Sequence, residues 1–140
     1  MVAAVCAWHE YHAAAAAELN RRLGNAEPMV VAAPALVETY AVLTRLPPPH
    51  RLSPADALAI LDASFMRSGR LIALDPASYR TLLRGAPNAG IAGGQTYDAV
   101  IACCAERANA SAVLTFNRRH FEALLPSGID VVVPGSPVAS

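Results

Sequence analysis

A chain of 140 residues is long enough for one domain and too short for two ordinary ones. Hydrophobic residues make up 54% of it and charged residues 16%, so a sizeable core can be buried and an intrinsically disordered chain is excluded. Eleven basic residues balance eleven acidic ones, which excludes binding of nucleic acid by bulk positive charge and requires any such contact to be local.

Predicted helices and strands alternate along the chain. Helices are predicted where apolar residues recur at the helical period between capping residues and glycine or proline stops, in the segments 9–23, 34–46, 53–68, 75–83, 96–108 and 117–125. Strands are predicted where β-branched and other aliphatic residues run together, in the segments 29–33, 71–74, 112–116 and 130–133. The alternation predicts parallel βαβ units in a three-layer α/β fold, with a central parallel sheet flanked by helices. We expect one domain over residues 1–133 and a loose tail over 134–140.

The cysteines indicate a reducing compartment, and the apolar runs are too short for a membrane span. Cys6, Cys103 and Cys104 lack the spacing of a zinc site, and we interpret them as buried small apolar residues. No apolar run reaches the roughly 18 to 20 residues that a membrane span needs, and the start of the chain lacks the basic segment of a signal peptide. We therefore expect a soluble, cytoplasmic protein that does not contact a membrane.

Three polar residues lie after predicted strands or at predicted helix starts, and open parallel sheets bind ligands where loops lead from the strand ends into helix N-termini. Glu38 lies early in the helix after the first strand, Asp98 in the first turn of a helix after a glycine-rich loop, and Asn117 directly after the third strand. Glu38 also interrupts an otherwise apolar helix, and a carboxylate that faces a core needs a partner. Carboxylate and amide oxygens suit Mg²⁺ or Mn²⁺ and not zinc, so we expect the three residues to meet in a metal site. The alternative for Asp98 is a carboxylate favoured only by the helix dipole.

Other polar residues beside these positions have simpler interpretations. Arg118 and Arg119 follow Asn117, and their guanidinium groups suit RNA phosphates, the alternative being a solvated helix face. His120 is interpreted as a surface or helix-end residue. Asp75, which precedes a proline, is interpreted as a helix N-cap.

Three blocks of sequence carry a family resemblance. They are the segment 34–46 around Glu38, the Tyr97-Asp98-Ala99 block after the glycine-rich loop, and the segment 114–121 around Asn117. In order and approximate spacing they resemble PIN-domain ribonucleases, and more narrowly the VapC toxins of bacterial toxin-antitoxin pairs. The resemblance implies an enzyme whose acidic residues hold Mg²⁺ or Mn²⁺, which activates water to cleave RNA. Glu38 and Asp98 then correspond to the family's second and third acidic residues, and Asn117 to a fourth, as a weaker contact.

The resemblance also implies partners, and the start of the chain departs from the family's pattern. The partners are an RNA substrate, a VapB-type antitoxin that lies across the acidic site, and a second copy of the chain in a homodimer. Family members begin with a strand that ends in Asp and leads into an apolar helix. Met1–Val5 is similar to that helix, and no Asp precedes Asp56. We therefore hypothesise that the native reading frame begins upstream of Met1.

Two other functions remain open from the sequence. With two acidic residues in the site, the chain is also compatible with a catalytically impaired PIN-like domain that only binds a protein partner. A small nucleotide-binding α/β domain is disfavoured, because Gly93 and Gly94 are not followed by the Gly-Lys-Ser or Gly-Lys-Thr of a phosphate-binding loop.

Overall fold

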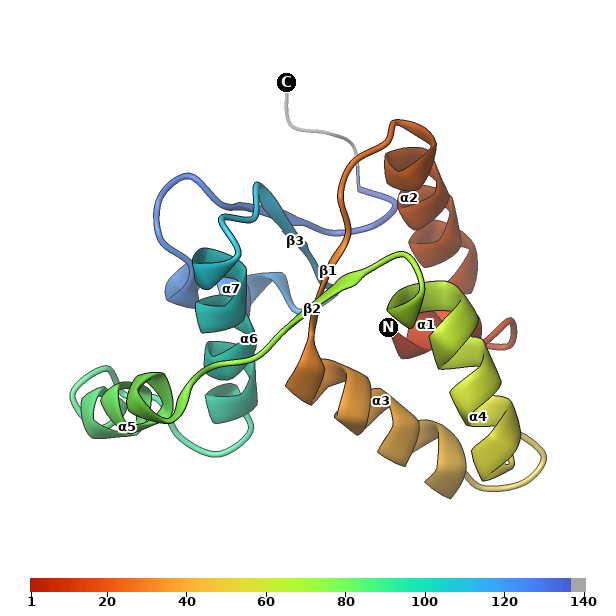
Figure 1. Cartoon of the computed structure of the whole chain (residues 1–140), viewed down its shortest axis with the longest axis horizontal. Helices are drawn as coiled ribbons and strands as arrows, with labels where there is room; N and C mark the ends of the chain where they lie inside the picture. The colour runs from red at the N-terminus through yellow and green to blue at the C-terminus, as the bar shows by residue number, and fades with distance from the viewer. Residues whose placement is uncertain (137–140) are drawn as a thin grey trace. The chain divides into compact units, whose positions relative to one another are not determined.

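The computed structural model, which describes residues 1–136, contains the helices and strands in the predicted order (Figure 1). Each predicted element is present, with its ends shifted by a few residues. None of the helices within this described part is long and apolar enough to cross a membrane. The elements are α1 (Val2–Val5), α2 (His12–Gly24), β1 (Val30–Ala32), α3 (Ala33–Arg45), α4 (Pro54–Leu61), the π-helical segment η1 (Asp62–Met66), β2 (Arg70–Ile72), α5 (Pro76–Gly85), α6 (Gln95–Arg107), β3 (Ala112–Leu114), α7 (Arg118–Leu124) and β4 (Asp130–Val132).

The chain divides into two compact units, Met1–Leu71 and Ile72–Ser140. The expectation of one domain over residues 1–133 stays a prediction. Residues 137–140 of the predicted loose tail lie outside the described residues. In the described part of that tail Pro134 is buried, and the backbone N–H of Ser136 donates to the carbonyl of Val133 at 3.1 Å. This first part of the tail therefore forms a turn against the end of the last strand.

The α/β class with parallel strands is confirmed, and the strands pair two by two. Among the described residues β1 pairs with β2, and β3 pairs with β4. The second pair is parallel, with Ala112 opposite Asp130 and Leu114 opposite Val132. In place of one continuous central sheet, the described part thus holds two two-stranded sheets. Each strand is only three residues long, which limits the ladder that it can form.

The first unit buries apolar residues from its helices and from β1. Leu43 of α3 and Ala57 of α4 are 0% exposed, and Phe65 of η1 packs in the same cluster. Leu36 and Leu43 lie seven positions apart on α3, which is about two helical turns, so both side chains are on the face that packs into this core. The partly buried side chains of α1 pack against the same cluster. This core fixes α3, the helix that carries Glu38.

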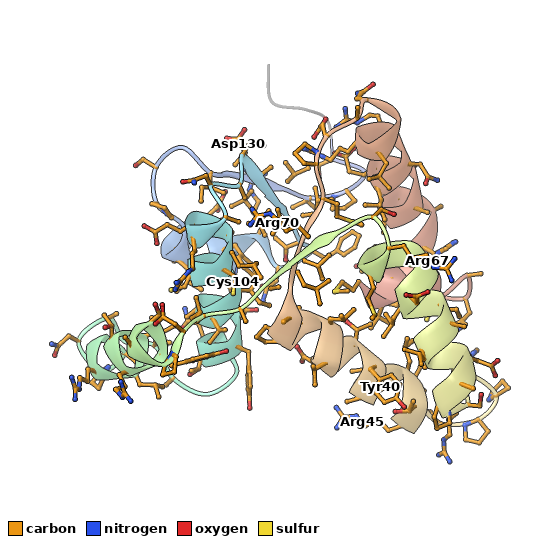
Figure 2. The ribbon with its side chains drawn as sticks, in the orientation of Figure 1. Tyr40, Arg45, Arg67, Arg70, Cys104 and Asp130 are labelled. Carbon is orange, nitrogen blue, oxygen red and sulfur yellow. The ribbon has the colours of Figure 1, made fainter. Side chains whose placement is uncertain are left out.

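The second unit is built around α6. Ala99, Ala102 and Cys104 are buried on this helix, and Phe121 of α7 is buried as well. Cys104, labelled in Figure 2, places its Sγ 4.0 Å from the carbonyl oxygen of Ile72. Burial raises the pKa of the Cys104 thiol, and it raises the pKa of Cys6 too. The interpretation of these cysteines as buried apolar residues is therefore confirmed for both.

Two predicted helix caps are present. The Ser53 hydroxyl accepts a hydrogen bond from the backbone N–H of Asp56 at 3.1 Å, at the start of α4. Asp75 accepts one from the backbone N–H of Ser78 at 2.8 Å, at the start of α5. Arg107 also lies 2.6 Å from the Asp75 carboxylate. The Ser78 N–H and then Arg107 hold the pKa of Asp75 at about 2. The interpretation of Asp75 as an N-cap is confirmed.

An ion-pair cluster on α2 makes the stability of the first unit depend on pH. Glu18 accepts hydrogen bonds from Arg21 at 2.8 Å and from Arg22 at 2.7 Å, which hold its pKa at about 2. A carboxylate whose pKa falls on folding stabilises the protein above its unfolded pKa of about 4.3 and loses that contribution as the pH falls.

We expect Glu18→Gln to lower the free energy of unfolding by about 1 kcal/mol at pH 7, the size typical of such partly exposed ion pairs. Urea denaturation should show this difference shrinking as the pH falls from about 5.5 to 3. Glu10→Gln, which alters an exposed carboxylate, is the control and should show no such trend. A difference that stays constant with pH would contradict the electrostatic origin.

Candidate active site

Asp98 lies in the first turn of α6, as the sequence predicts. Gly93, at a φ of +56° that glycine tolerates best, turns the chain into this helix. The helix dipole favours a negative charge at this end. The next residue, Ala99, is buried and anchors this turn, whereas the side chain of Asp98 is 22% exposed. The carboxylate is thus held by a rigid helix and still reaches solvent.

Asn117 is brought to Asp98 by the turn between β3 and α7. The hydroxyl of Thr115 accepts a hydrogen bond from the backbone N–H of Asn117 at 3.0 Å, and α7 begins at the next residue. The Asn117 amide nitrogen, Nδ2, lies 3.4 Å from Asp98 Oδ2. Two of the three residues proposed from the sequence therefore lie together, at the N-terminal ends of two packed helices.

His120 is a member of this cluster that the sequence interpretation missed. Its Nδ1 lies 2.7 Å from Asp98 Oδ2 and 2.5 Å from Asn117 Nδ2. Its interpretation as only a surface or helix-end residue is therefore incomplete: the ring is 46% exposed, but it contacts the carboxylate. The signal was available in the spacing, because residues three apart share a face of a helix. If Asn117 is assigned to the site, the same spacing predicts that the His120 side chain is directed toward that site.

Glu38 belongs to the first unit and is exposed on α3. The expectation that it faces a core is wrong, because α3 turns Leu36 and Leu43 inward and leaves Val37, 69% exposed, beside Glu38. Apolar neighbours along a sequence do not imply a buried position when part of the apolar face is itself exposed. Near Glu38, burial lowers the pKa of the Met1 amino group, and the charges of Cys6 and Glu38 raise it.

The two arginines beside the cluster differ in their contacts. Arg118 donates through Nε to Glu122 Oε1 at 2.6 Å, one helical turn along α7. Arg119 is exposed and makes no ion pair with any residue in the described range 1–136. Of the two guanidinium groups predicted to contact RNA, that of Arg119 is therefore the less engaged.

The donor atoms of the cluster fit a hard cation, although they do not complete a site. No group of three or more His, Cys, Asp or Glu side chains that could hold a metal ion occurs within residues 1–136. Asp98 offers a carboxylate and Asn117 an amide oxygen, which are ligands that Mg²⁺ and Mn²⁺ accept. The hydrogen bonds from Asn117 and His120 to Asp98 go to Oδ2, which leaves Oδ1 available to a ligand.

Comparison with known proteins supports the resemblance noted in the sequence. Residues 1–124 match the model of the PIN domain. Ribonuclease VapC40 of Mycobacterium tuberculosis, strains H37Rv and CDC 1551 / Oshkosh, is 42% identical over 122 residues, which cover 87% of this chain and 84% of the relative. Ribonuclease VapC27 of strain H37Rv is 36% identical over 99 residues, 71% of this chain and 69% of that protein. No solved structure matches the chain. This chain therefore belongs to the PIN-domain family, as a relative of the VapC ribonucleases.

Proposed function

We propose that this protein is a VapC-type toxin, an endoribonuclease that uses Mg²⁺ or Mn²⁺ to cleave RNA phosphodiesters. The observation that carries the proposal is the meeting of Asp98 and Asn117 at the N-terminal ends of α6 and α7, in a chain whose relatives are named ribonucleases. A carboxylate and an amide at helix starts suit binding of a cation together with phosphate oxygens.

Asp98 and the amide oxygen of Asn117, which lie together in the second unit, would hold the metal ion. The assignment of Glu38, in the first unit, as a further ligand stays a prediction. When bound, such an ion would supply a Lewis acid that makes water a better nucleophile and that neutralises charge on the scissile phosphate. Asp98 would contribute a negative charge from the first turn of α6. Asn117 would add an oxygen without charge, so its contribution to affinity should be smaller than that of Asp98.

The RNA and protein partners follow from the same proposal. Arg119, exposed on α7 two positions beyond Asn117, would pair with a phosphate of the RNA, and Arg118 would do so after leaving Glu122. A VapB-type antitoxin would neutralise the toxin by covering the acidic site. We further propose that the toxin acts in the cytoplasm, as a homodimer.

The test measures whether RNA cleavage depends on the metal ion. The purified chain is incubated with a mixture of structured RNAs in Mn²⁺, in EDTA, and in EDTA followed by excess Mn²⁺. We expect cleavage in Mn²⁺, none in EDTA, and recovery when Mn²⁺ is restored. Cleavage that persists in EDTA would contradict metal dependence. No cleavage in Mn²⁺ would contradict the ribonuclease proposal and favour a PIN-like domain that only binds a protein.

A further inference from the structure

The contact between His120 and Asp98 joins α7 to α6 inside the proposed site. His120 Nδ1 lies 2.7 Å from Asp98 Oδ2, a distance typical of a charge-assisted hydrogen bond. This imidazole is neither a proposed ligand of the metal ion nor a proposed contact of the RNA. Among the described residues, Asp98 has this ring and the Asn117 amide as its side-chain hydrogen-bond partners.

The chemistry of the two groups decides which nitrogen carries the hydrogen. An ionised carboxylate only accepts hydrogen bonds, so Nδ1 must donate to Asp98 Oδ2. Because Nδ1 then carries a hydrogen, it cannot also accept a hydrogen bond from Asn117 Nδ2, which lies 2.5 Å away. A hydrogen bond to a charged acceptor is roughly twice as strong as one between neutral groups, so the carboxylate determines the tautomer of the ring.

The backbone on both sides of this hydrogen bond is fixed by packing. Phe121, the residue after His120, is 4% exposed and anchors α7 in the second unit. Ala99, the residue after Asp98, is buried and anchors the first turn of α6. A hydrogen bond between two anchored helices removes the rotational freedom of the carboxylate and fixes the position of Oδ1, the oxygen that His120 does not contact.

We propose that His120 is a positioning residue: its Nδ1–H holds Asp98 Oδ2 so that Oδ1 is set in place to receive the divalent cation. This inference rests on the proposed function, because it requires Asp98 to be a ligand. Residues that hold a ligating side chain in place typically account for about 10- to 100-fold in metal affinity. His120 does not touch the cation or the RNA in this role.

The test compares two substitutions of His120. His120→Leu removes the donor at similar volume, and His120→Asn keeps an N–H near the place of Nδ1. We expect calorimetric titration with Mn²⁺ to show about 10- to 100-fold weaker binding for His120→Leu and a smaller loss for His120→Asn. Glu122→Gln, on the same helix and away from Asp98, should leave the affinity unchanged. Thermal melts of each variant show whether the fold is retained.

A second measurement needs no metal. The ¹⁵N chemical shifts of the His120 ring in the metal-free chain report which nitrogen carries the hydrogen. We expect it on Nδ1 in the wild-type chain, with loss of this preference in Asp98→Ala. A hydrogen on Nε2 alone, or wild-type Mn²⁺ affinity in a folded His120→Leu variant, would overturn the inference. If Asp98→Asn also binds Mn²⁺ like the wild type, the proposed function itself fails.

Discussion

Asp98→Asn is expected to lower the rate of metal-dependent RNA cleavage by at least about 100-fold. The amide has nearly the same shape as the carboxylate, so the contacts within α6 remain. The substitution removes the negative charge that would attract the cation, and a neutral amide oxygen is a weaker ligand for Mg²⁺ or Mn²⁺. Initial cleavage rates at fixed RNA concentration, measured over a range of Mn²⁺ concentrations, check this result.

Asp130→Asn provides the matched control for this prediction. Asp130 is an exposed aspartate in the same unit, at the start of β4, and its backbone N–H pairs with the carbonyl of Ser111. The change therefore removes one negative charge from the second unit without touching the cluster. Its cleavage rate should equal that of the wild-type chain. Equal rates for Asp98→Asn and the wild type would refute the role given to Asp98.

Gly69→Ala is expected to destabilise the first unit by about 1 to 3 kcal/mol, the usual cost of overpacking a core. A Cβ at this position would lie 2.8 Å from Val31 Cγ2 and would also collide with the backbone oxygen of Phe65. Val31 and Phe65 are both buried in the core cluster, so neither can move without disturbing other contacts. Urea denaturation monitored by circular dichroism measures the loss.

Gly24→Ala is the control for the same substitution in open space. A Cβ at Gly24, the last residue of α2, would meet no atom within 4 Å. Alanine there restricts the unfolded chain, so the variant should be as stable as the wild type or slightly more stable. If Gly69→Ala and Gly24→Ala lower the free energy of unfolding equally, the close approach of β1 and η1 does not explain why residue 69 is glycine.

The order and type of the elements could be predicted because local signals specify them. The Ser53-Pro54 and Asp75-Pro76 starts are N-cap and first-turn proline signals, and both caps form as expected. The π-helical end of α4 was not predictable, because it differs from an α-helix only in hydrogen bonds that span five residues instead of four, as the bond from the Arg67 N–H to the Asp62 carbonyl shows. Which strands pair depends on contacts between distant segments, and short strands carry little information about their partners.

The candidate site was only partly predictable for a similar reason. Asp98 and Asn117 follow a loop and a strand, positions that the parallel-strand rule singles out, and the structure places them together. The exposure of Glu38 depends on which face of α3 the core covers, and the sequence of that helix is apolar on more than one face. Predicting the contact of His120 with Asp98 needs the three-residue spacing from Asn117 and also the orientation of the His120 ring. Only the packing of α7 against α6 determines that orientation.

The most direct measurement is a calorimetric titration of the wild-type chain and Asp98→Asn with Mn²⁺ under identical conditions. If Asp98 is a ligand in a metal-dependent ribonuclease, the wild-type chain gives a saturable binding curve and the variant gives none at the same concentrations. Identical curves for the two proteins, or no binding by the wild-type chain, would contradict the metal site on which the proposed ribonuclease function depends.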